Sequence, residues 1–306
     1  MEFEHIPVLA GETIEKLNIR PDGIYLDLTV GKGGHSKMIL QELSDEGRLI
    51  ALDQDKEAIE AAKANLAYFD NVTFVNSNFE NFEQILEDLD IDYIDGALMD
   101  IGVSSYQIDN ADRGFSYMHD GPLDMRMNQE NELTAAKIIR EYSEEDLARI
   151  FFDYGEEKFS RQIARNIVKE RAEREIRTTG ELAELVRKSF KSEDAHPEKR
   201  VFQALRIEVN RELEVLTNTI DKVVDHLNTG GRLAIITFHS LEDRIVKNKF
   251  KELATDCICP PDFPVCVCNH HASVKLVNRK PIVASKEELK ANSRSKPAKL
   301  RVCQRI

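Results

Sequence analysis

Residues 23–36 read Gly-Ile-Tyr-Leu-Asp-Leu-Thr-Val-Gly-Lys-Gly-Gly-His-Ser, and this stretch decides the fold. Its apolar residues alternate from Ile24 to Leu28, which is typical of a buried β-strand. The three glycines that follow give the backbone φ freedom and allow a ligand to approach it closely. Ser36 stands where it can cap a helix that runs to Leu43. The stretch therefore predicts a strand, a glycine-rich turn and a helix, with a cofactor bound at the turn.

A second strand, residues 48–53, ends in Asp53, about 20 residues beyond the turn, where a carboxylate binds ribose hydroxyls in nucleotide-binding folds. A dinucleotide site would need a third glycine at the position of Ser36. Asp27 instead places an acid at the end of the first strand, which favours a nucleoside ligand with a cationic amino-acid end over a pyrophosphate. S-adenosylmethionine has this shape, and we predict it as the cofactor. The alternative is that the glycines only form a tight turn.

The composition of the 306-residue chain is that of an ordinary soluble protein, with 42% hydrophobic and 32% charged residues. This length suggests about two domains. The N-terminus has neither the cationic start nor the apolar segment of a signal peptide, and the sequence has no run of about 18 apolar residues. We therefore expect a cytoplasmic protein that does not bind a membrane.

The net charge of −13 disfavours a nucleic-acid partner, because phosphates attract basic surfaces. The charge is unevenly distributed, however, since residues 275–306 contain ten Lys or Arg and two Glu. This basic tail either lies along a phosphate backbone or forms a solvated face.

The first hundred residues alternate between strands and helices. After the strand at residues 48–53, a helical pattern at residues 56–69 precedes a strand at residues 72–75. A second helical pattern at residues 82–89 precedes a strand at residues 94–99. This order predicts a parallel sheet that binds its ligand at the carboxyl ends of its strands. The residues at or just beyond those ends are Asp27, Asp53, Phe79 and Asp100.

The alternation stops near Asp109. The following segment is nearly all helical, with capping boxes at Ser143 and Thr178 and one long helical stretch from Glu198 onward. We therefore predict an α/β sheet domain formed by residues 1–110 and 217–306, interrupted by an all-helical insertion at residues 111–216.

Beyond this insertion the alternation resumes. Gly230 and Gly231 are predicted to end a helix, and residues 232–238 to form a central strand. Ser240 is predicted to cap the next helix. Two β-rich pieces, residues 274–277 and 300–306, are predicted to pair as a hairpin at the sheet edge.

Asp100 follows the fourth strand, beside the predicted methyl donor, and is our candidate catalytic residue. One substrate that such a residue would serve is the exocyclic amine of a base such as cytosine. This amine is a poor nucleophile because its lone pair is delocalised into the ring. An acceptor must therefore bind its N–H and help remove the proton, with the amine held about 3–3.5 Å from the methyl carbon. The alternative is that Asp100 only binds cofactor or caps a turn.

Several side chains beyond this strand are candidates for contact with a nucleobase. Phe115 and Arg126 lie in an irregular segment, where they could stack on or clamp an extruded base, although an aromatic side chain there could equally pack in a core. His239 follows the strand at residues 232–238 and could touch the substrate. Arg206 and Asn210 share one helix face, which either contacts RNA or is solvated.

The chain has five cysteines, of which four cluster in two C-x-C pairs: Cys257, Cys259, Cys266 and Cys268. An odd, clustered set suits reduced thiols in the cytosol better than a disulfide framework. Together with the histidines that follow, these thiols could ligate zinc, or the intervening prolines could simply stiffen a loop. C-x-C spacing is less diagnostic than C-x-x-C, and we assign no metal ligand from sequence.

Taken together, the motifs resemble the RsmH (MraW) family of small-subunit ribosomal RNA cytosine-N4 methyltransferases. The resemblance covers essentially the whole chain, in order. It rests on His5–Leu9, Asp27–His35, Asp100–Ser105, Arg113–Ser116, Asp120–Arg126, Phe202–Arg206 with Val209–Asn210, and Phe238–Arg244.

This resemblance implies a class I (Rossmann-like) α/β methyltransferase sheet with an inserted helical subdomain, acting on the N4 of one cytidine in the decoding centre of 16S ribosomal RNA. It implies S-adenosylmethionine as cofactor, the small ribosomal subunit or a late assembly intermediate as partner, and a homodimer. Tyr106 stands where many relatives have proline. The implied cofactor contacts are Gly33, Gly34, His35, Asp53, Phe79, Asp100 and Gln107.

Two other functions would share part of this pattern. A DNA aminomethylase would share the cofactor turn, but it would carry an Asp/Asn/Ser-Pro-Pro-aromatic motif where this chain has Asp100-Ile-Gly-Val. An RNA-binding ribosome assembly factor with a vestigial nucleoside pocket would carry the same motifs as an enzyme, and binding without turnover would reveal it.

Overall fold

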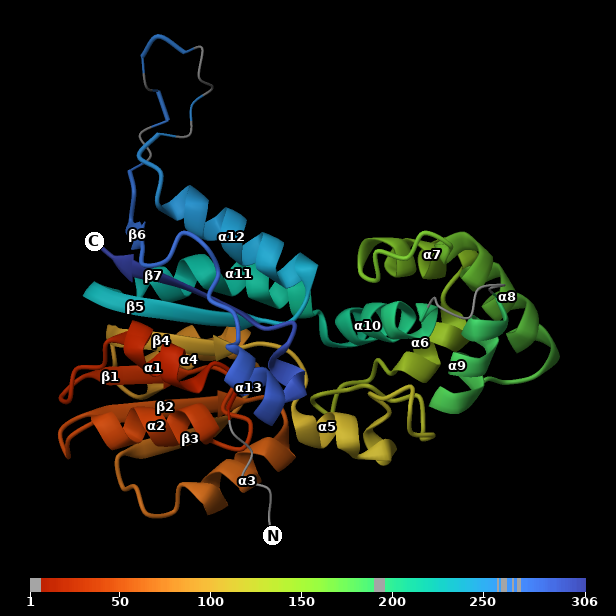
Figure 1. The fold of residues 1–306 in the computed structure, drawn as a ribbon, viewed down its shortest axis with the longest axis horizontal. Coiled ribbons are helices and arrows are strands. Elements are labelled where there is room, and N and C mark those ends of the chain that lie inside the picture. Colours follow the sequence, from red (N-terminus) through yellow and green to blue (C-terminus); the bar gives the residue numbers. More distant parts are fainter. Residues whose placement is uncertain (1–6, 190–195, 258, 260–262, 266, 269–270) are drawn as a thin grey trace. The chain divides into compact units, whose positions relative to one another are not determined.

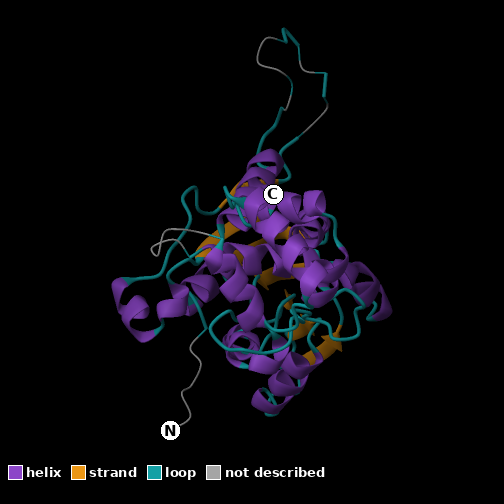
Figure 2. Cartoon of the chain, turned by 90° about the vertical axis from the view of Figure 1, so that its right-hand side faces the viewer, coloured by secondary structure: helices purple, strands orange, loops and turns teal. Residues whose placement is uncertain are grey.

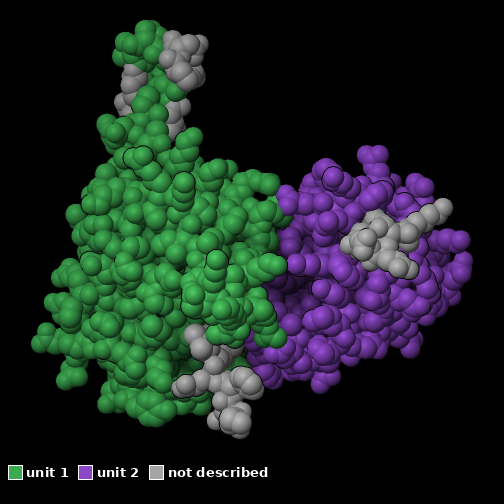
Figure 3. Space-filling view, viewed as in Figure 1, with its two compact units in different colours: residues 1–102, 213–306 green, residues 103–212 purple. Residues whose placement is uncertain are grey.

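The structure is a computed structural model that describes residues 7–189, 196–257, 259, 263–265, 267–268 and 271–306. Two residues that the sequence analysis named, His5 and Cys266, lie outside these ranges, and so does His270, one of the histidines that follow the cysteines. The chain forms two compact units, which Figure 3 colours separately. Unit 1 comprises residues 1–102 and 213–306, and unit 2 comprises residues 103–212. The division thus falls eight residues before the first predicted boundary, 110, and four before the second, 216.

Unit 1 is built on a seven-stranded sheet with the order β3-β2-β1-β4-β5-β7-β6. The first five strands run parallel, and β7 is antiparallel to both of its neighbours. This confirms the predicted α/β sheet with its hairpin at the edge. The strands are β1 (Ile24–Asp27), β2 (Arg48–Asp53), β3 (Val72–Asn76), β4 (Ile94–Asp100), β5 (Leu227–Thr237), β6 (Val274–Leu276) and β7 (Lys299–Arg305).

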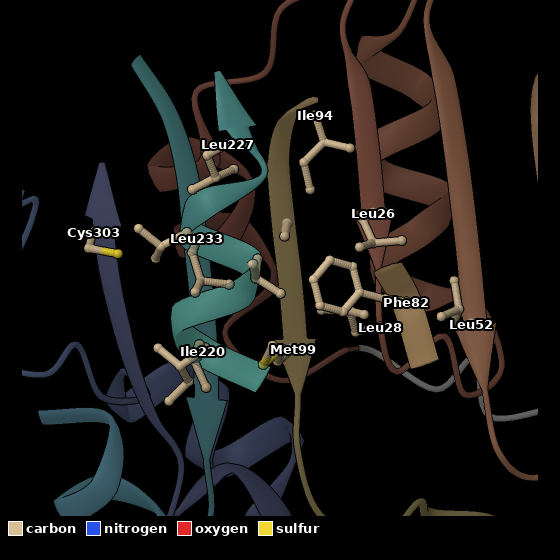
Figure 4. Close-up of a cluster of buried hydrophobic side chains, with 14 of the residues drawn as sticks. Leu26, Leu28, Leu52, Phe82, Ile94, Met99, Ile220, Leu227, Leu233 and Cys303 are labelled. Carbon is tan, nitrogen blue, oxygen red and sulfur yellow. The ribbon is translucent and has the colours of Figure 1, made fainter. Parts of the chain in front are cut away.

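Helices cover both faces of this sheet because both faces are apolar. On one face, α4, α11 and α12 bury their apolar sides. Figure 4 shows Phe82 of α4 beside Leu26 of β1, Leu28 just beyond β1, and Leu52 of β2. On the other face lie α1, α2 and α3. The helices are α1 (Ala10–Leu17), α2 (Gly34–Glu42), α3 (Lys56–Asn65), η1 (Phe79–Asn81), α4 (Phe82–Asp88), α11 (Glu212–Asp225), α12 (Ser240–Leu253), α13 (Lys286–Ala291) and η3 (Ser293–Ser295).

Unit 2 is helical and has its own apolar core. The helices, drawn in purple in Figure 2, surround residues such as Phe151, Ile163 and Leu205, each fully buried. The predicted caps Ser143 and Thr178 accept hydrogen bonds from the first turns of their helices. The elements are α5 (Ser105–Asp109), η2 (Ala111–Arg113), α6 (Ala135–Glu141), α7 (Glu144–Asp153), α8 (Ser160–Glu173), α9 (Thr179–Lys188) and α10 (Pro197–Asn210).

Three local predictions were wrong. The long helix predicted from Glu198 is broken at Arg211, whose φ of 53° ends α10 before α11 begins. Gly230 and Gly231 lie inside β5, in an irregularity that separates the pairing of Ile94 with Leu227 from that of Gly96 with Arg232. The preceding helix had already ended at Asp225.

The third error concerns helix caps. Ser36 lies inside the first turn of α2, which is preceded by Gly33, and Ser240 is the first residue of α12, which is capped by His239. Within the ranges that the structure describes, no helix is both long enough and apolar enough to cross a membrane.

Candidate active site

The strand order of unit 1 reverses between β1 and β4, which lie side by side with Leu26 opposite Ala97. Connections from these two strands leave in opposite directions, so a crevice opens outside their carboxyl ends. The turn at residues 28–33 follows β1 at this place, and Asp100 ends β4. Both lie where an open α/β sheet binds its ligand.

Two aspartates hold the glycine-rich turn from inside unit 1. The Gly31 amide donates to Oδ2 of Asp53 over 2.9 Å. The Thr29 amide donates to Oδ1 of Asp27, and the Ser36 hydroxyl donates to the other oxygen of this carboxyl group over 2.6 Å. Ser36 was predicted to cap the helix. Its hydroxyl instead binds Asp27 and thereby helps to hold the turn.

Gly33 and Gly34 allow the chain to pass close to its neighbours. Gly33 has a φ of 84°, and a Cβ added there would lie 2.9 Å from Cδ1 of Leu66. A Cβ on Gly34 would lie 2.6 Å from Cγ of Pro7. Gly31, with φ 53°, borders open space, because a Cβ there would have no heavy atom within 4 Å. The turn is thus packed on its inner side and open at Gly31, as a ligand cradle requires.

Asp100 and His35 meet across the crevice. Oδ2 of Asp100 lies 3.4 Å from Nδ1 of His35. The other ring nitrogen, Nε2, lies 3.0 Å from the carbonyl oxygen of Val8, which can only accept, so Nε2 carries the proton. In a neutral ring Nδ1 is then the nitrogen without a proton, and it faces the Asp100 carboxyl group.

The second oxygen of Asp100 has no hydrogen-bond partner among the described residues, although it is buried. The amide of Asp100 is already satisfied, since it donates to Oγ1 of Thr29 over 2.6 Å. A buried, unsatisfied carboxylate oxygen costs free energy unless a ligand supplies the missing donor. This atom is therefore the clearest sign of a bound group in unit 1.

Burial raises the pKa of three acids at these strand ends. Removal from water, with the Asp27 and Glu242 carboxylates nearby, raises the pKa of Asp100 to about 8. Burial raises the pKa of Asp53 to about 7 and that of Asp27 to about 6, in both cases against hydrogen bonds that lower it. Strongly perturbed acids in a crevice are typical of a binding or catalytic site, and a cation placed among them would restore their charged forms.

Phe79 begins η1 beyond β3 and packs, partly buried, against the core of unit 1. Its position is fixed by Asn78, whose side chain caps the 3₁₀ turn and donates to Oε1 of Gln54. His239 caps α12, and Oε2 of Glu242 accepts hydrogen bonds from the Phe238 and His239 amides. His239 is thus held at the carboxyl end of β5, as the sequence predicts.

The remaining predicted site residues belong to unit 2, where the structure gives their side chains partners. Gln107 is buried, and its Oε1 accepts from the Ser104 amide in a capping box for α5. Phe115 packs, partly buried, against the unit 2 core, with the Arg113 guanidinium 5.9 Å from its ring centre.

Arg126 and Asn210 organise one irregular segment of unit 2. Arg126 makes a two-point pair with Asp124 and donates to the carbonyl oxygens of Gln129 and Asn131. Asn210 is buried and brackets the same segment, because its amide group donates to the Met125 carbonyl and its oxygen accepts from the Met127 amide. These contacts shape the segment that follows the Asp120–Arg126 motif.

Arg206 forms a two-point ion pair with Glu212, with both N···O distances 2.8 Å. The sequence analysis left two alternatives for Arg206 and Asn210, contact with RNA or a solvated helix face. Because both side chains have protein partners, they do not form a solvated face.

Sequence reasoning missed Thr29 and Glu242. Thr29 fixes Asp100 through its hydroxyl, and Glu242 both caps α12 and raises the Asp100 pKa. Thr29 lies in the motif Asp27–His35, and Glu242 lies in the motif Phe238–Arg244. The sequence thus pointed to both segments, but it did not indicate what these two residues do. A surface hollow of about 610 Å³ beside α4 and His226 is lined by none of the predicted site residues.

These features fit S-adenosylmethionine. Its ammonium and sulfonium groups are cations, and unit 1 offers three buried or half-buried carboxyl groups at one crevice, one with an unsatisfied oxygen. Its adenosine part matches an open glycine turn with an acid at the end of the second strand. The sheet order and the acid-lined turn at its switch point define a class I methyltransferase.

Comparisons with known proteins agree. A model of the MraW methylase family matches residues 2–306. A protein of Clostridium botulinum (strain Loch Maree / Type A3) named ribosomal RNA small subunit methyltransferase H is 58% identical over 309 residues, with 100% of each chain covered. A protein of the same name from Clostridioides difficile (strain 630) is 52% identical over 311 residues, again over 100% of each chain. The chain belongs to the MraW methylase family. The predictions of a class I methyltransferase and of S-adenosylmethionine as cofactor are confirmed.

Proposed function

We propose that this enzyme methylates the exocyclic N4 of one cytidine in the decoding centre of small-subunit ribosomal RNA. The observation that carries the proposal is Asp100, whose buried Oδ1 lacks a partner at the sheet's ligand crevice and whose pKa is raised to about 8. The name that both relatives carry, ribosomal RNA small subunit methyltransferase H, supports the RNA substrate.

Different residues of unit 1 bind different parts of the cofactor. The backbone at Gly33 and Gly34 borders the amino-acid end of the cofactor, and Asp53 accepts from the ribose hydroxyls. Phe79 packs beside the adenine ring, and His35 holds Asp100 in place. The family resemblance adds Gln107, which lies in the capping box of α5, to the proposed cofactor contacts. When bound, S-adenosylmethionine supplies a methyl group activated by a sulfonium.

Asp100 supplies what a weakly nucleophilic amine lacks. Its carboxylate accepts a hydrogen bond from the N4 amine, which orients the nitrogen lone pair toward the methyl carbon. S-adenosylmethionine would supply the methyl group and keep the C–S electron pair. On accepting this group the amine nitrogen would gain positive charge, and its proton would pass to an acceptor. A carboxylate with a raised pKa is a stronger base than an exposed one, so Asp100 is suited to take this proton.

Unit 2 and His239 supply the contacts to the substrate. Phe115 stacks on the extruded cytosine. Arg126, whose guanidinium is held by Asp124, clamps the same base. Arg206 and Asn210 act as positioning residues, because their side chains are bound to Glu212 and to the backbone of Met125 and Met127. His239 adds a contact at the end of β5.

Incubation with labelled S-adenosylmethionine tests this proposal. The substrates are small ribosomal subunits that lack the modification, small subunits that already carry it, and the free RNA. The proposal predicts label in the unmodified subunits or in their assembly intermediates alone. Tight binding of the cofactor and of the subunits without any transfer of label would instead support an RNA-binding assembly factor with a vestigial nucleoside pocket.

A further inference from the structure

The loop between α12 and β6 brings three cysteine thiols together. The Sγ atoms of Cys257, Cys259 and Cys268 all lie within 4.8 Å of one another. The described residues of this loop, drawn in blue in Figure 1, lie well away from the glycine-rich turn between β1 and α2. Neither the methyl-transfer site nor the sheet core accounts for the cluster.

The sulfur spacing matches a tetrahedral thiolate site. Sγ of Cys268 lies 3.8 Å from Sγ of Cys257. Two thiolates bound to one zinc ion at about 2.3 Å, with a tetrahedral angle between them, are separated by about 3.8 Å. A disulfide would bring the two sulfurs to about 2.05 Å, so the observed distance fits a shared metal ion and excludes an S–S bond.

A backbone hydrogen bond reaches one of the three sulfurs. The Val267 amide donates to Sγ of Cys259 over 3.3 Å. Backbone N–H groups that donate to ligand sulfurs orient these sulfurs in metal sites. This contact places a residue of the second C-x-C pair against a thiol of the first.

The large apolar side chains that the structure describes in this loop are exposed. Phe263, Val265 and Val267 are 50%, 70% and 65% exposed. Burial of these side chains therefore does not hold the two C-x-C pairs together, and a metal crosslink would do so.

We propose that Cys257, Cys259 and Cys268 bind a structural zinc ion that closes this loop. Zinc is the preferred ion because it accepts thiolates in tetrahedral geometry and needs no redox partner. Binding releases the proton of each coordinating thiol to solvent, so three S–H bonds are exchanged for three Zn–S bonds. The proposal rests on these three thiols, is independent of the proposed RNA substrate, and assigns the site no part in methyl transfer.

Metal analysis of the full chain tests it. The protein is produced in zinc-supplemented medium, purified with reductant and without chelator, and its zinc content is measured by mass spectrometry. We expect about one zinc per wild-type chain and almost none in the double variant Cys257→Ser/Cys268→Ser. In the wild type, replacement of zinc by cobalt should give the near-ultraviolet thiolate charge-transfer band, and the double variant should lose it.

Two controls separate this site from general effects. Val265→Ser alters the same exposed loop but removes no thiol, and Cys303→Ala removes the thiol buried in β7. Both should keep the zinc. Limited proteolysis should cut between α12 and β6 faster after chelation in the wild type and equally fast with or without chelator in the double variant. A wild-type chain without zinc or a cobalt band, or a double variant that keeps its zinc, would overturn the proposal.

Discussion

Oδ2 of Asp100, at the end of β4, lies 3.4 Å from Nδ1 of His35, in the first turn of α2. Because Nε2 of His35 faces the Val8 carbonyl, the ring can point only Nδ1 at the carboxyl group. The pair links the two elements on either side of the switch point and leaves Oδ1 of Asp100 for a ligand. This geometry makes Asp100 the residue with the sharpest consequences for activity.

Asp100→Asn should reduce kcat by about 10²- to 10⁴-fold, the usual contribution of a general base. An amide cannot take the amine proton, although it still fills the space. Single-turnover methyl transfer to unmodified small subunits measures the loss. Asp92→Asn, an exposed substitution just before the start of β4, is the control and should leave the rate unchanged. Equal rates for the two variants would remove Asp100 from the chemistry.

The sheet unit should lose stability as the pH rises from about 4 to 8. An aspartate in the unfolded chain titrates near its ordinary value of about 3.9, whereas the pKa of Asp100 in the folded state is about 8. The folded state therefore keeps a proton that the unfolded state releases. The stability linked to this proton is fully present below about pH 4 and is lost as the pH rises through about 8. Asp27 and Asp53 act in the same direction at lower pH, with pKa values of about 6 and 7.

Urea midpoints followed by circular dichroism across this range measure the slope. Asp100→Asn has no proton to lose, so its midpoint should fall less between about pH 6 and 8 than that of the wild type. Saturating S-adenosylmethionine should flatten the wild-type curve, because its cations favour the charged carboxylates. Parallel curves for wild type and variant would contradict the raised pKa of Asp100.

Gly33→Ala should destabilise unit 1 by about 1–2 kcal/mol and weaken cofactor binding. The φ of 84° disfavours any residue with a Cβ, and the new methyl would lie 2.9 Å from Leu66. Chemical denaturation and calorimetric titration with S-adenosylmethionine measure the two effects. Gly11→Ala in α1 is the control, since a Cβ there meets nothing within 4 Å and should slightly stabilise the helix. Cofactor affinity unchanged by Gly33→Ala would argue against the turn as the binding cradle.

Asn210→Ala should cost about 1–3 kcal/mol in unit 2, because the Met125 carbonyl and the Met127 amide would lose buried partners. Hydrogen exchange should speed up first in residues 124–131, which Asn210 brackets together with Arg126. Asn218→Ala, an exposed change on α11, is the control and should leave this exchange unaltered. If Asn210 contacted RNA alone, its replacement would lower subunit binding and leave this segment protected.

The sheet was predictable because its signals are local. Alternating apolar strands, glycine turns and terminal acids fixed β1, β2 and β4 and placed Asp53 and Asp100 at the same edge. The errors arose where tertiary contacts override local propensity. Ser36 was predicted to cap a helix, but its buried hydroxyl donates to Asp27. Gly230 is compatible with a helix end and with an irregularity in a strand, and the structure has the irregularity. The αL break at Arg211 lacks the glycine or asparagine that usually marks such a helix end.

The site was predictable only in part. Residue types and positions at strand ends pointed to Asp100, but its unsatisfied oxygen, its raised pKa and its contact with His35 depend on packing between distant segments. The roles of Arg206 and Asn210 were least predictable, because a polar residue on a helix face looks the same in sequence whether it faces solvent or a buried backbone.

The most direct test of the central claim is the identity of the methylated nucleoside. Unmodified small subunits are methylated with isotopically labelled S-adenosylmethionine, digested to nucleosides and analysed by mass spectrometry against synthetic standards, with nuclease mapping of the labelled position. The account predicts N4-methylcytidine at one decoding-centre cytidine, strongly reduced by Asp100→Asn. Label on carbon 5 of cytosine, on a ribose hydroxyl or at a site outside the decoding centre would contradict it.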